Sequence, residues 1–330
     1  MLFCTLLNIE TELLLFLNNR LLKFFPGVPI FFFISGFLIY WSFQRNSKNI
    51  KKFLKHRFLR IYPALWVCLL FTVFLITLQN SFLITDSQLY IWMICQVSFF
   101  QFYTPEILRF WGCGTPNGSL WTIVVELQFY LLVPVLFYLI KKNKYYLIFL
   151  VIASILANIY IGSLNPENIY SKLGRVFILP YLYYFIFGIL TFIYWHKING
   201  LLKNKFKFWF LLYLLWSYIF NVFLQIETYS YWIDSPINLI SDFILLGLTF
   251  SAATSHISFS DTVLKGVDIS YGVYIYHMVI INLFITYGFV DNFVYLILAL
   301  ALVIFISYLS YVFIEKPCLK LKMTKLEFLK

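Results

Sequence analysis

The segment Gly118-Ser-Leu-Trp-Thr-Ile-Val-Val-Glu-Leu-Gln-Phe-Tyr-Leu-Leu-Val-Pro134 carries one carboxyl side chain inside a long apolar run. Its length and apolarity predict a membrane-spanning helix, with Glu126 well inside the apolar part. An ionisable group at this depth costs at least a few kcal/mol and is tolerated where it faces a protein interior or a water-filled cavity. Glu126 is therefore a candidate functional residue. The alternative is a buried glutamate that only joins two helices by hydrogen bonds.

Three polar side chains accompany Glu126 at helical spacing. Ser119, Thr122 and Tyr130 recur every three or four residues and so share its helix face. Pro134 removes one backbone hydrogen bond, which predicts a kink just past Tyr130.

The composition indicates an integral membrane protein. Of 330 residues, 62% are hydrophobic, 22% are aromatic and only 12% are charged, against about 25% charged in soluble domains. Apolar segments leave no room for a soluble domain, so we expect an all-α polytopic bundle forming one domain over 1–330. Nine full spans are predicted, namely Val28–Gln44, Ile61–Gln79, Ser119–Ile140, Tyr145–Ser163, Val176–Trp195, Phe208–Gln225, Pro236–Thr254, Asp268–Tyr287 and Phe293–Ile314.

The distribution of positive charge predicts the orientation. Seven Lys and Arg residues, and no acidic residue, lie in the loop from Arg45 to Arg60, which marks this loop as cytoplasmic. Alternation of the spans then places 20 of the 25 Lys and Arg on the inner side, including those of the C-terminal tail. The net charge of +11 is thus explained by positive residues that gather on the inner side of the membrane, and no nucleic-acid partner is expected.

Two segments fall outside this pattern of spans. Residues 1–26 are apolar but are interrupted by Glu10 and Glu12, which predicts an interfacial or partial helix. The outer connection from Asn80 to Gly118 contains an apolar stretch, Gln88–Tyr103, that is too short to span and suits a re-entrant or interfacial helix over a cavity. Asn117-Gly118-Ser119 matches a glycosylation sequon.

Two further ionisable side chains fall within predicted spans. Glu126 and Asp242 both lie about 10 Å deep from the outer side, and His277 lies about 13 Å from the inner side, at 1.5 Å per residue. Together they would line one cavity that opens outward. An interhelical hydrogen bond is slightly favoured for Asp242, and a satisfied interior histidine is as probable as a site role for His277.

Arg57 and Arg60 stand three residues apart where the next span enters the membrane. Their residue chemistry by itself favours anchoring and contact with anionic lipid. A clamp for the phosphates of a cytoplasmic donor is the alternative, because guanidinium binds phosphate bidentately.

Several function classes lack their motifs. The chain has no Walker A loop, no G-x-G-x-x-G, no H-E-x-x-H and no G-x-S-x-G, so hydrolases, nucleotidases and zinc proteases have no support. The five cysteines form neither a C-x-x-C pair nor a metal-like cluster, so we expect free thiols and no metal.

Four segments occur in an order that resembles the acyltransferase 3 family of bacterial inner-membrane enzymes, which O-acylate surface polysaccharides and lipopolysaccharide. The resemblance spans Gly27 to Pro317, nearly the whole chain. The segments are Gly27-Val-Pro-Ile-Phe-Phe-Phe-Ile-Ser-Gly-Phe37, Arg57-Phe-Leu-Arg-Ile-Tyr-Pro63, Ser119-Leu-Trp-Thr122 through Glu126 to Tyr130 and Pro134, and Ile269-Ser-Tyr-Gly-Val-Tyr-Ile-Tyr-His277 with Ile314-Glu-Lys-Pro317.

The resemblance implies a ten-span bundle that passes an acyl group, usually acetyl, from cytoplasmic acyl-CoA to a hydroxyl of a glycan or lipid-linked glycan outside. It implies no tightly bound cofactor and contact with membrane lipids. It assigns donor binding to Arg57 and Arg60, which reverses the preference for simple anchoring. It also marks the intramembrane Glu126 and the C-terminal signature residues His277 and Glu315, and Ser119, Trp121 and Tyr130 are further candidates from the matching segments.

This chain departs from the family at its start. Members normally open with a further span that bears a Leu-Arg pair and a histidine thought to be the catalytic base, whereas residues 1–26 contain no histidine. We therefore expect either an upstream start or a truncated, inactive copy. If the chain is active, the reaction needs a general base, and His277 is the candidate substitute. A polysaccharide or lipid transporter is the alternative class, although the sequence shows no repeat symmetry of the transporter kind.

Overall fold

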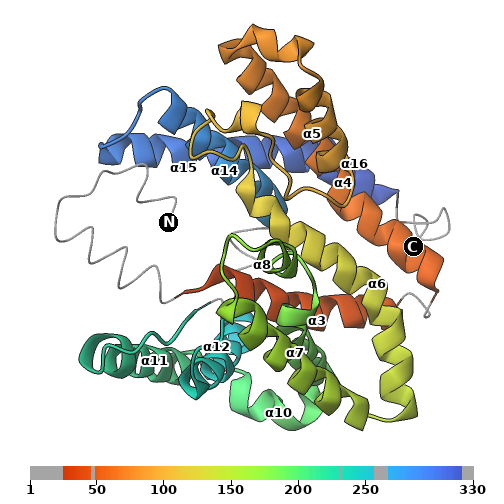
Figure 1. Ribbon diagram of the computed structural model, residues 1–330. Helices are drawn as coiled ribbons and strands as arrows, with labels where there is room; N and C mark the ends of the chain where they lie inside the picture. Colours follow the sequence, from red (N-terminus) through yellow and green to blue (C-terminus); the bar gives the residue numbers. More distant parts are fainter. Residues whose placement is uncertain (1–24, 46–48, 231, 256–266, 322–330) are drawn as a thin grey trace. The chain divides into compact units, whose positions relative to one another are not determined.

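The computed structural model describes residues 25–45, 49–230, 232–255 and 267–321 (Figure 1). All regular structure in these residues is helical, which confirms the predicted all-α class. The internal contacts divide the chain into two compact units, and each is described by itself. Unit 1 contains the described residues of Lys51–Val124 and Val267–Lys330, and unit 2 contains those of Asn19–Ile50 and Val125–Gly266.

Unit 1 is built around three apolar helices, of which α14 and α15 pack side by side (Figure 1). Ala299 and Val303 of α15 pack against Ile280 of α14. A second core, which includes Trp92 and Trp111, is formed by side chains of α4 and of the segment that follows it. The elements are α4 (Ile50–Gln79), η3 (Ser81–Thr85), α5 (Ser87–Val97), η4 (Glu106–Leu108), η5 (Gly118–Leu120), α14 (Ser270–Thr286), α15 (Phe293–Ser310), η9 (Tyr311–Glu315) and α16 (Lys316–Lys320).

Unit 2 is held together by close packing of α3 on α9 and of α11 on α12. Gly36 and Gly188 allow the first of these contacts, because a Cβ atom on either glycine would overlap a backbone carbonyl of the other helix. Small residues at this crossing thus let the two helices approach closely. The elements are α3 (Gly27–Arg45), α6 (Trp121–Lys142), α7 (Tyr145–Ser163), α8 (Ile169–Gly174), η6 (Leu179–Tyr181), α9 (Leu182–Ile193), α10 (Trp195–Leu202), α11 (Phe206–Ser217), η7 (Tyr218–Phe223) and α12 (Pro236–Ser255).

The helices confirm a polytopic membrane protein, but they do not confirm nine full spans. Among the described residues, seven helices are long and apolar enough to cross a membrane. An eighth span results if Leu179–Ile193 is joined to Trp195–Leu202 across a 98° bend. The predicted span Asp268–Tyr287 is a shorter apolar helix of 17 residues, α14. The helix expected within residues 1–26 lies almost wholly outside the described residues.

Two expected connections can be compared with the structure. The basic segment from Arg45 to Arg60 is not a loop throughout, because α4 already begins at Ile50. Lys, Arg and Leu are good helix formers and no Pro or Gly interrupts them, so the charges mark a membrane boundary without ending the helix. The stretch within Gln88–Tyr103 forms α5, which at 11 residues is too short to span a membrane. Trp92 and Gln96 of α5 line a small space of about 10 Å³, and the larger cavity expected under this helix stays a prediction.

Candidate active site

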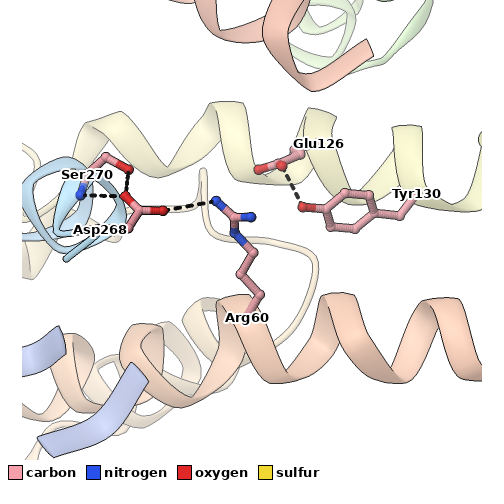
Figure 2. A network of polar contacts seen from close by, with 5 residues as sticks. All are labelled: Arg60, Glu126, Tyr130, Asp268 and Ser270. Carbon is pink, nitrogen blue, oxygen red and sulfur yellow. Dashed lines mark hydrogen bonds and ion pairs between the residues drawn. The ribbon is translucent and has the colours of Figure 1, made fainter. Parts of the chain in front are cut away.

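An ion pair joins α4 to the start of α14 in unit 1. Arg60 Nη2 lies 3.7 Å from Asp268 Oδ2, and Asp268 Oδ1 accepts hydrogen bonds from the Ser270 backbone N–H at 3.2 Å and from the Ser270 hydroxyl at 2.5 Å. Figure 2 shows this series of contacts. The side chains of Arg60 and Asp268 are 43% and 62% exposed, so the ion pair contributes at most about 1 kcal/mol. Arg60 can therefore exchange this partner for another anion at little cost.

Sequence segments far apart in the chain meet at this end of unit 1. The Tyr271 hydroxyl donates to the Ile61 carbonyl at 2.9 Å. Gly272 lies against Ser307, where an added Cβ would come within 2.9 Å of the serine Cβ. Glu315 is buried, accepts a hydrogen bond from Ser310 at 3.2 Å, and lies within electrostatic range of Arg60. The resembling segments of α4, α14 and η9 thus form one packed cluster.

Arg57 lies one turn before Arg60 on α4, so the two arginines share one face of this helix. Its guanidinium carbon lies 5.6 Å from the centre of the Phe53 ring, a cation–π distance. Phe53 is completely buried and therefore provides a fixed support for the Arg57 side chain.

His277 occupies α14 with one ring nitrogen fixed. Nδ1 lies 2.6 Å from the Tyr274 carbonyl oxygen and 3.2 Å from that of Val273. A carbonyl can only accept, so Nδ1 carries the proton and the neutral ring presents the lone pair of Nε2. Within the described part of the chain, Nε2 makes no hydrogen bond. This arrangement leaves Nε2 able to accept a proton from a substrate.

Tyr274 also connects α14 to the start of the segment Gly118–Pro134, which carries Glu126. Its hydroxyl hydrogen-bonds with the Ser119 carbonyl and with the Thr122 hydroxyl. The Ser119 hydroxyl donates to Asn117 Oδ1 at 2.8 Å, and Trp121, the first residue of α6, is half-buried. Ser119 and Thr122 therefore serve to attach the beginning of α6 to the helix that carries His277.

Glu126 is half-buried on α6 within unit 2. Tyr130 is almost completely buried, and its hydroxyl donates to Glu126 Oε1 at 2.5 Å (Figure 2). The predicted shared face is thus confirmed for this pair, and α6 continues past Pro134 to Lys142. The hydrogen bond holds the carboxyl group in one orientation along the helix.

Asp242 is the centre of a separate buried network in unit 2. It is 3% exposed on α12, Tyr183 donates to its Oδ2 at 3.0 Å, and Tyr184 is a second hydrogen-bonding neighbour. Asp242 and Glu126 belong to unit 2, whereas His277 belongs to unit 1. The outward cavity shared by these three residues stays a prediction.

Sequence reasoning missed three amides that connect elements. Asn282 is fully buried, donates to the carbonyls of Thr115 and Pro116 at 2.7 and 3.0 Å, and accepts from the Cys113 N–H at 3.1 Å. Asn117 is buried and donates to the Ile275 carbonyl at 2.8 Å, so the amide of the sequon already has a structural partner.

The third amide is Gln128, which lies in unit 2. It accepts from the Ile178 N–H at 2.9 Å and donates to the Val176 carbonyl at 2.8 Å. Both Gln128 and Asn282 could have been found from the sequence, because each is an amide side chain within an otherwise apolar predicted helix.

An integral-membrane helical protein with an exchangeable arginine ion pair and a histidine prepared to accept a proton has the features of a membrane-embedded group-transfer enzyme. The sequence profile that describes the acyltransferase domain of the acyltransferase 3 family matches residues 5–312. The chain therefore belongs to the acyltransferase 3 family, and it is an acyltransferase rather than a transporter.

Named relatives agree with this assignment. Nodulation protein 10 of Rhizobium leguminosarum bv. viciae is 31% identical over 315 residues, which cover 90% of this chain and 83% of that protein. The O-acetyl transferase of Shigella phage Sf6 is 30% identical over 311 residues, covering 91% and 86% of the two chains. The peptidoglycan O-acetyltransferase OatA of Listeria monocytogenes is 28% identical over 170 residues, which cover 44% of this chain and 26% of that protein. No solved structure matches the chain significantly.

Proposed function

We propose that this acyltransferase moves an acyl group, acetyl in the first instance, from cytoplasmic acyl-CoA to a hydroxyl of a cell-surface polysaccharide or lipopolysaccharide sugar. The names of the phage and Listeria relatives support O-acetylation and a glycan acceptor. The observation that carries the proposal is the contact of His277 Nδ1 with the Tyr274 carbonyl, which leaves Nε2 to act as the base that transfer to a hydroxyl requires.

In this scheme His277 is the general base. The sugar oxygen attacks the thioester carbonyl while its proton passes to Nε2, and the new C–O bond forms a tetrahedral intermediate. The C–S bond then breaks, and the histidine returns the proton to the departing sulfur of CoA. The Tyr274 carbonyl accepts from Nδ1–H throughout, so the ring keeps its orientation and the positive charge of the imidazolium is stabilised.

Arg57 and Arg60 bind the phosphates of the donor. Arg60 is suited to this role because its ion pair with Asp268 is exposed and therefore weak. A phosphate group offers the guanidinium a bidentate partner with more charge than one carboxylate. Asp268 would hold Arg60 in place until the donor arrives.

Glu126 positions the acceptor. Its carboxyl group is held by Tyr130 and remains half-buried, so it can accept a hydrogen bond from a sugar hydroxyl at low cost. The excess of Lys and Arg on alternate connections supports an orientation with the C-terminus in the cytoplasm, and the resemblance to the family suggests the bacterial inner membrane.

Replacement of His277 tests the proposal. In inverted membrane vesicles that contain the chain and its host glycan, we expect His277→Ala to lower acetyl transfer from acetyl-CoA by about 10²- to 10⁴-fold, the usual contribution of a general base. His56→Ala is the control for loss of a histidine. Transfer by His277→Ala within tenfold of the wild type would exclude His277 as the base.

Matched pairs test the other assignments. Glu126→Gln removes the charge but keeps the size, and Glu167→Gln, at an exposed glutamate paired with Lys172, is its control. Arg60→Ala is compared with Arg109→Ala, because Arg109 forms an exposed ion pair with Glu106 at 2.8 Å. Unchanged acetylation by both Glu126→Gln and Arg60→Ala would rule out the enzyme in this form.

A further inference from the structure

A cavity of about 470 Å³ opens within unit 2, where the ends of α3, α6 and α9 meet the start of α10. This volume lies in the range of sites that hold small organic ligands, about 300–1,000 Å³. The 98° bend between α9 and α10 places Trp195 and His196 in the cavity wall. We name it the α3–α10 pocket, and none of the candidate active-site residues lines it.

Five aromatic side chains form most of the wall of the pocket. The ring of Phe37 lies 5.3 Å from that of Phe192 and 5.9 Å from that of Trp195, both nearly perpendicular to it, and Tyr40 lies 5.7 Å from Phe192 and 6.0 Å from Phe137. All of these contacts are edge-to-face except the tilted Tyr40–Phe137 pair, and together they hold the rings in place before any ligand binds. Preformed aromatic surfaces are suited to stacking on a planar ring.

The polar side chains of the pocket carry hydrogen-bonding groups and positive charge but no carboxylate. Gln44 hydrogen-bonds the Tyr40 hydroxyl and offers the rest of its amide to a ligand. Lys141 Nζ lies 5.2 Å from the centre of the Phe137 ring, and His196 is exposed. Within the described part of the chain, neither Lys141 nor His196 has an acidic partner. The pocket therefore suits a ligand that combines a planar ring with negative charge.

We propose that the α3–α10 pocket binds the adenine nucleotide part of the acyl-CoA donor, an assignment that rests on the function proposed above. The adenine ring would stack among the aromatic side chains, and the Gln44 amide would reach its polar edge, as amide side chains do for adenine. Lys141 would neutralise the phosphate on the ribose of this nucleotide and His196 would donate a hydrogen bond to it, whereas the diphosphate is the group assigned above to Arg57 and Arg60. A phospholipid is less suited, because its acyl chains need an aliphatic groove and only Ile140 and Ile193 supply aliphatic surface.

The experiment compares two acetyl donors in vesicles that contain the full chain. Acetyl-CoA carries the nucleotide, whereas S-acetylpantetheine has the same thioester without it. We expect Lys141→Ala and Phe192→Leu each to lower kcat/KM for acetyl-CoA about fivefold to tenfold, through KM, the loss typical of one charged or stacking contact. The kcat/KM for S-acetylpantetheine should not change. Lys142→Ala, one residue further along α6 and outside the pocket, should affect neither donor.

Each outcome separates this proposal from its alternatives. An equal fall for both donors would show a structural role for the pocket and overturn the nucleotide assignment, as would unchanged kinetics with both. If Lys141→Ala instead reduced retention of phosphatidylglycerol by the purified protein and left the acetyl-CoA kinetics unchanged, the pocket would be a lipid site. If wild-type chain transferred acetyl from neither donor, the proposed function itself would fail.

Discussion

Replacement of Asp242 distinguishes a structural network from a second reactive carboxyl group. Asp242 is nearly fully buried, and the hydroxyls of Tyr183 and Tyr184 are hydrogen-bonding neighbours on another helix. Tyr183 is completely buried and Tyr184 is 3% exposed, so water cannot replace a lost acceptor. The residue types by themselves slightly favoured such an interhelical role.

The magnitude follows from the groups left without partners. Asp242→Ala removes the acceptor of two buried hydroxyls, each costing about 1–3 kcal/mol, and opens a small cavity, so the free energy of unfolding should fall by about 3–5 kcal/mol. Asp242→Asn keeps one acceptor oxygen, and its NH₂ group can donate to the other hydroxyl, so a loss of about 1 kcal/mol is expected. Tyr183→Phe should cost about as much as Asp242→Asn.

The assay combines stability with activity. Denaturant unfolding of the purified protein in detergent gives the loss of stability, and acetyl transfer per folded molecule gives the activity. In the double variant Tyr183→Phe/Asp242→Ala, the two losses should fall short of additivity by about 0.5–3 kcal/mol, because both substitutions break the same contact. Activity per folded molecule should remain within about threefold of the wild type.

A different result would refute the structural role. If Asp242→Asn left the free energy of unfolding unchanged and lowered acetyl transfer a hundredfold or more, Asp242 would take part in the reaction. Additive losses in the double variant would show that the hydrogen bond to Tyr183 does not contribute to stability.

Three further predictions concern packing and orientation. Gly36→Val should abolish a stable fold, because the valine side chain would overlap a carbonyl of α9. Gly27→Val is the control and should fold, because there is open space around the Cβ position of Gly27. The yield of monodisperse protein reports on both variants, and an equal yield would contradict the packing argument. Asn282→Ala should lower the free energy of unfolding by about 2–4 kcal/mol, because two buried carbonyls and one N–H lose their partner. A loss below about 1 kcal/mol in denaturant unfolding would mean that water replaces the amide. In single-cysteine variants, an impermeant maleimide added to whole cells should label Cys113, which is exposed, and should label Cys318 only after permeabilisation; the reverse order would invert the predicted topology.

The sequence by itself determined the class of structure. Long apolar stretches can only satisfy their backbone groups in lipid as helices, so the all-α polytopic fold followed from composition and spacing. The same reasoning selected Glu126, because a carboxyl group within an apolar helix requires a polar partner, and the structure supplies Tyr130 one turn away. Local spacing was sufficient here because both residues share one helix.

The sequence did not predict where helices end or bend. The charges after Arg45 signal the membrane boundary, but α4 begins ten residues before Arg60 because helix propensity is independent of that boundary. The 98° bend after Ile193 has no Pro or Gly at its site, so no local signal announces it. The α3–α10 pocket depends on this bend and was therefore not predicted.

Only the tertiary structure decided which distant groups meet. Arg60 and Asp268 are separated by 208 positions, and Asn282 binds backbone carbonyls more than 160 positions away. A hydrogen bond or an ion pair depends on distance in space, whereas periodicity in a sequence reports only neighbours along one helix. The sequence also could not predict which ring nitrogen of His277 acts as a base, because that depends on which nitrogen lies beside the Tyr274 carbonyl.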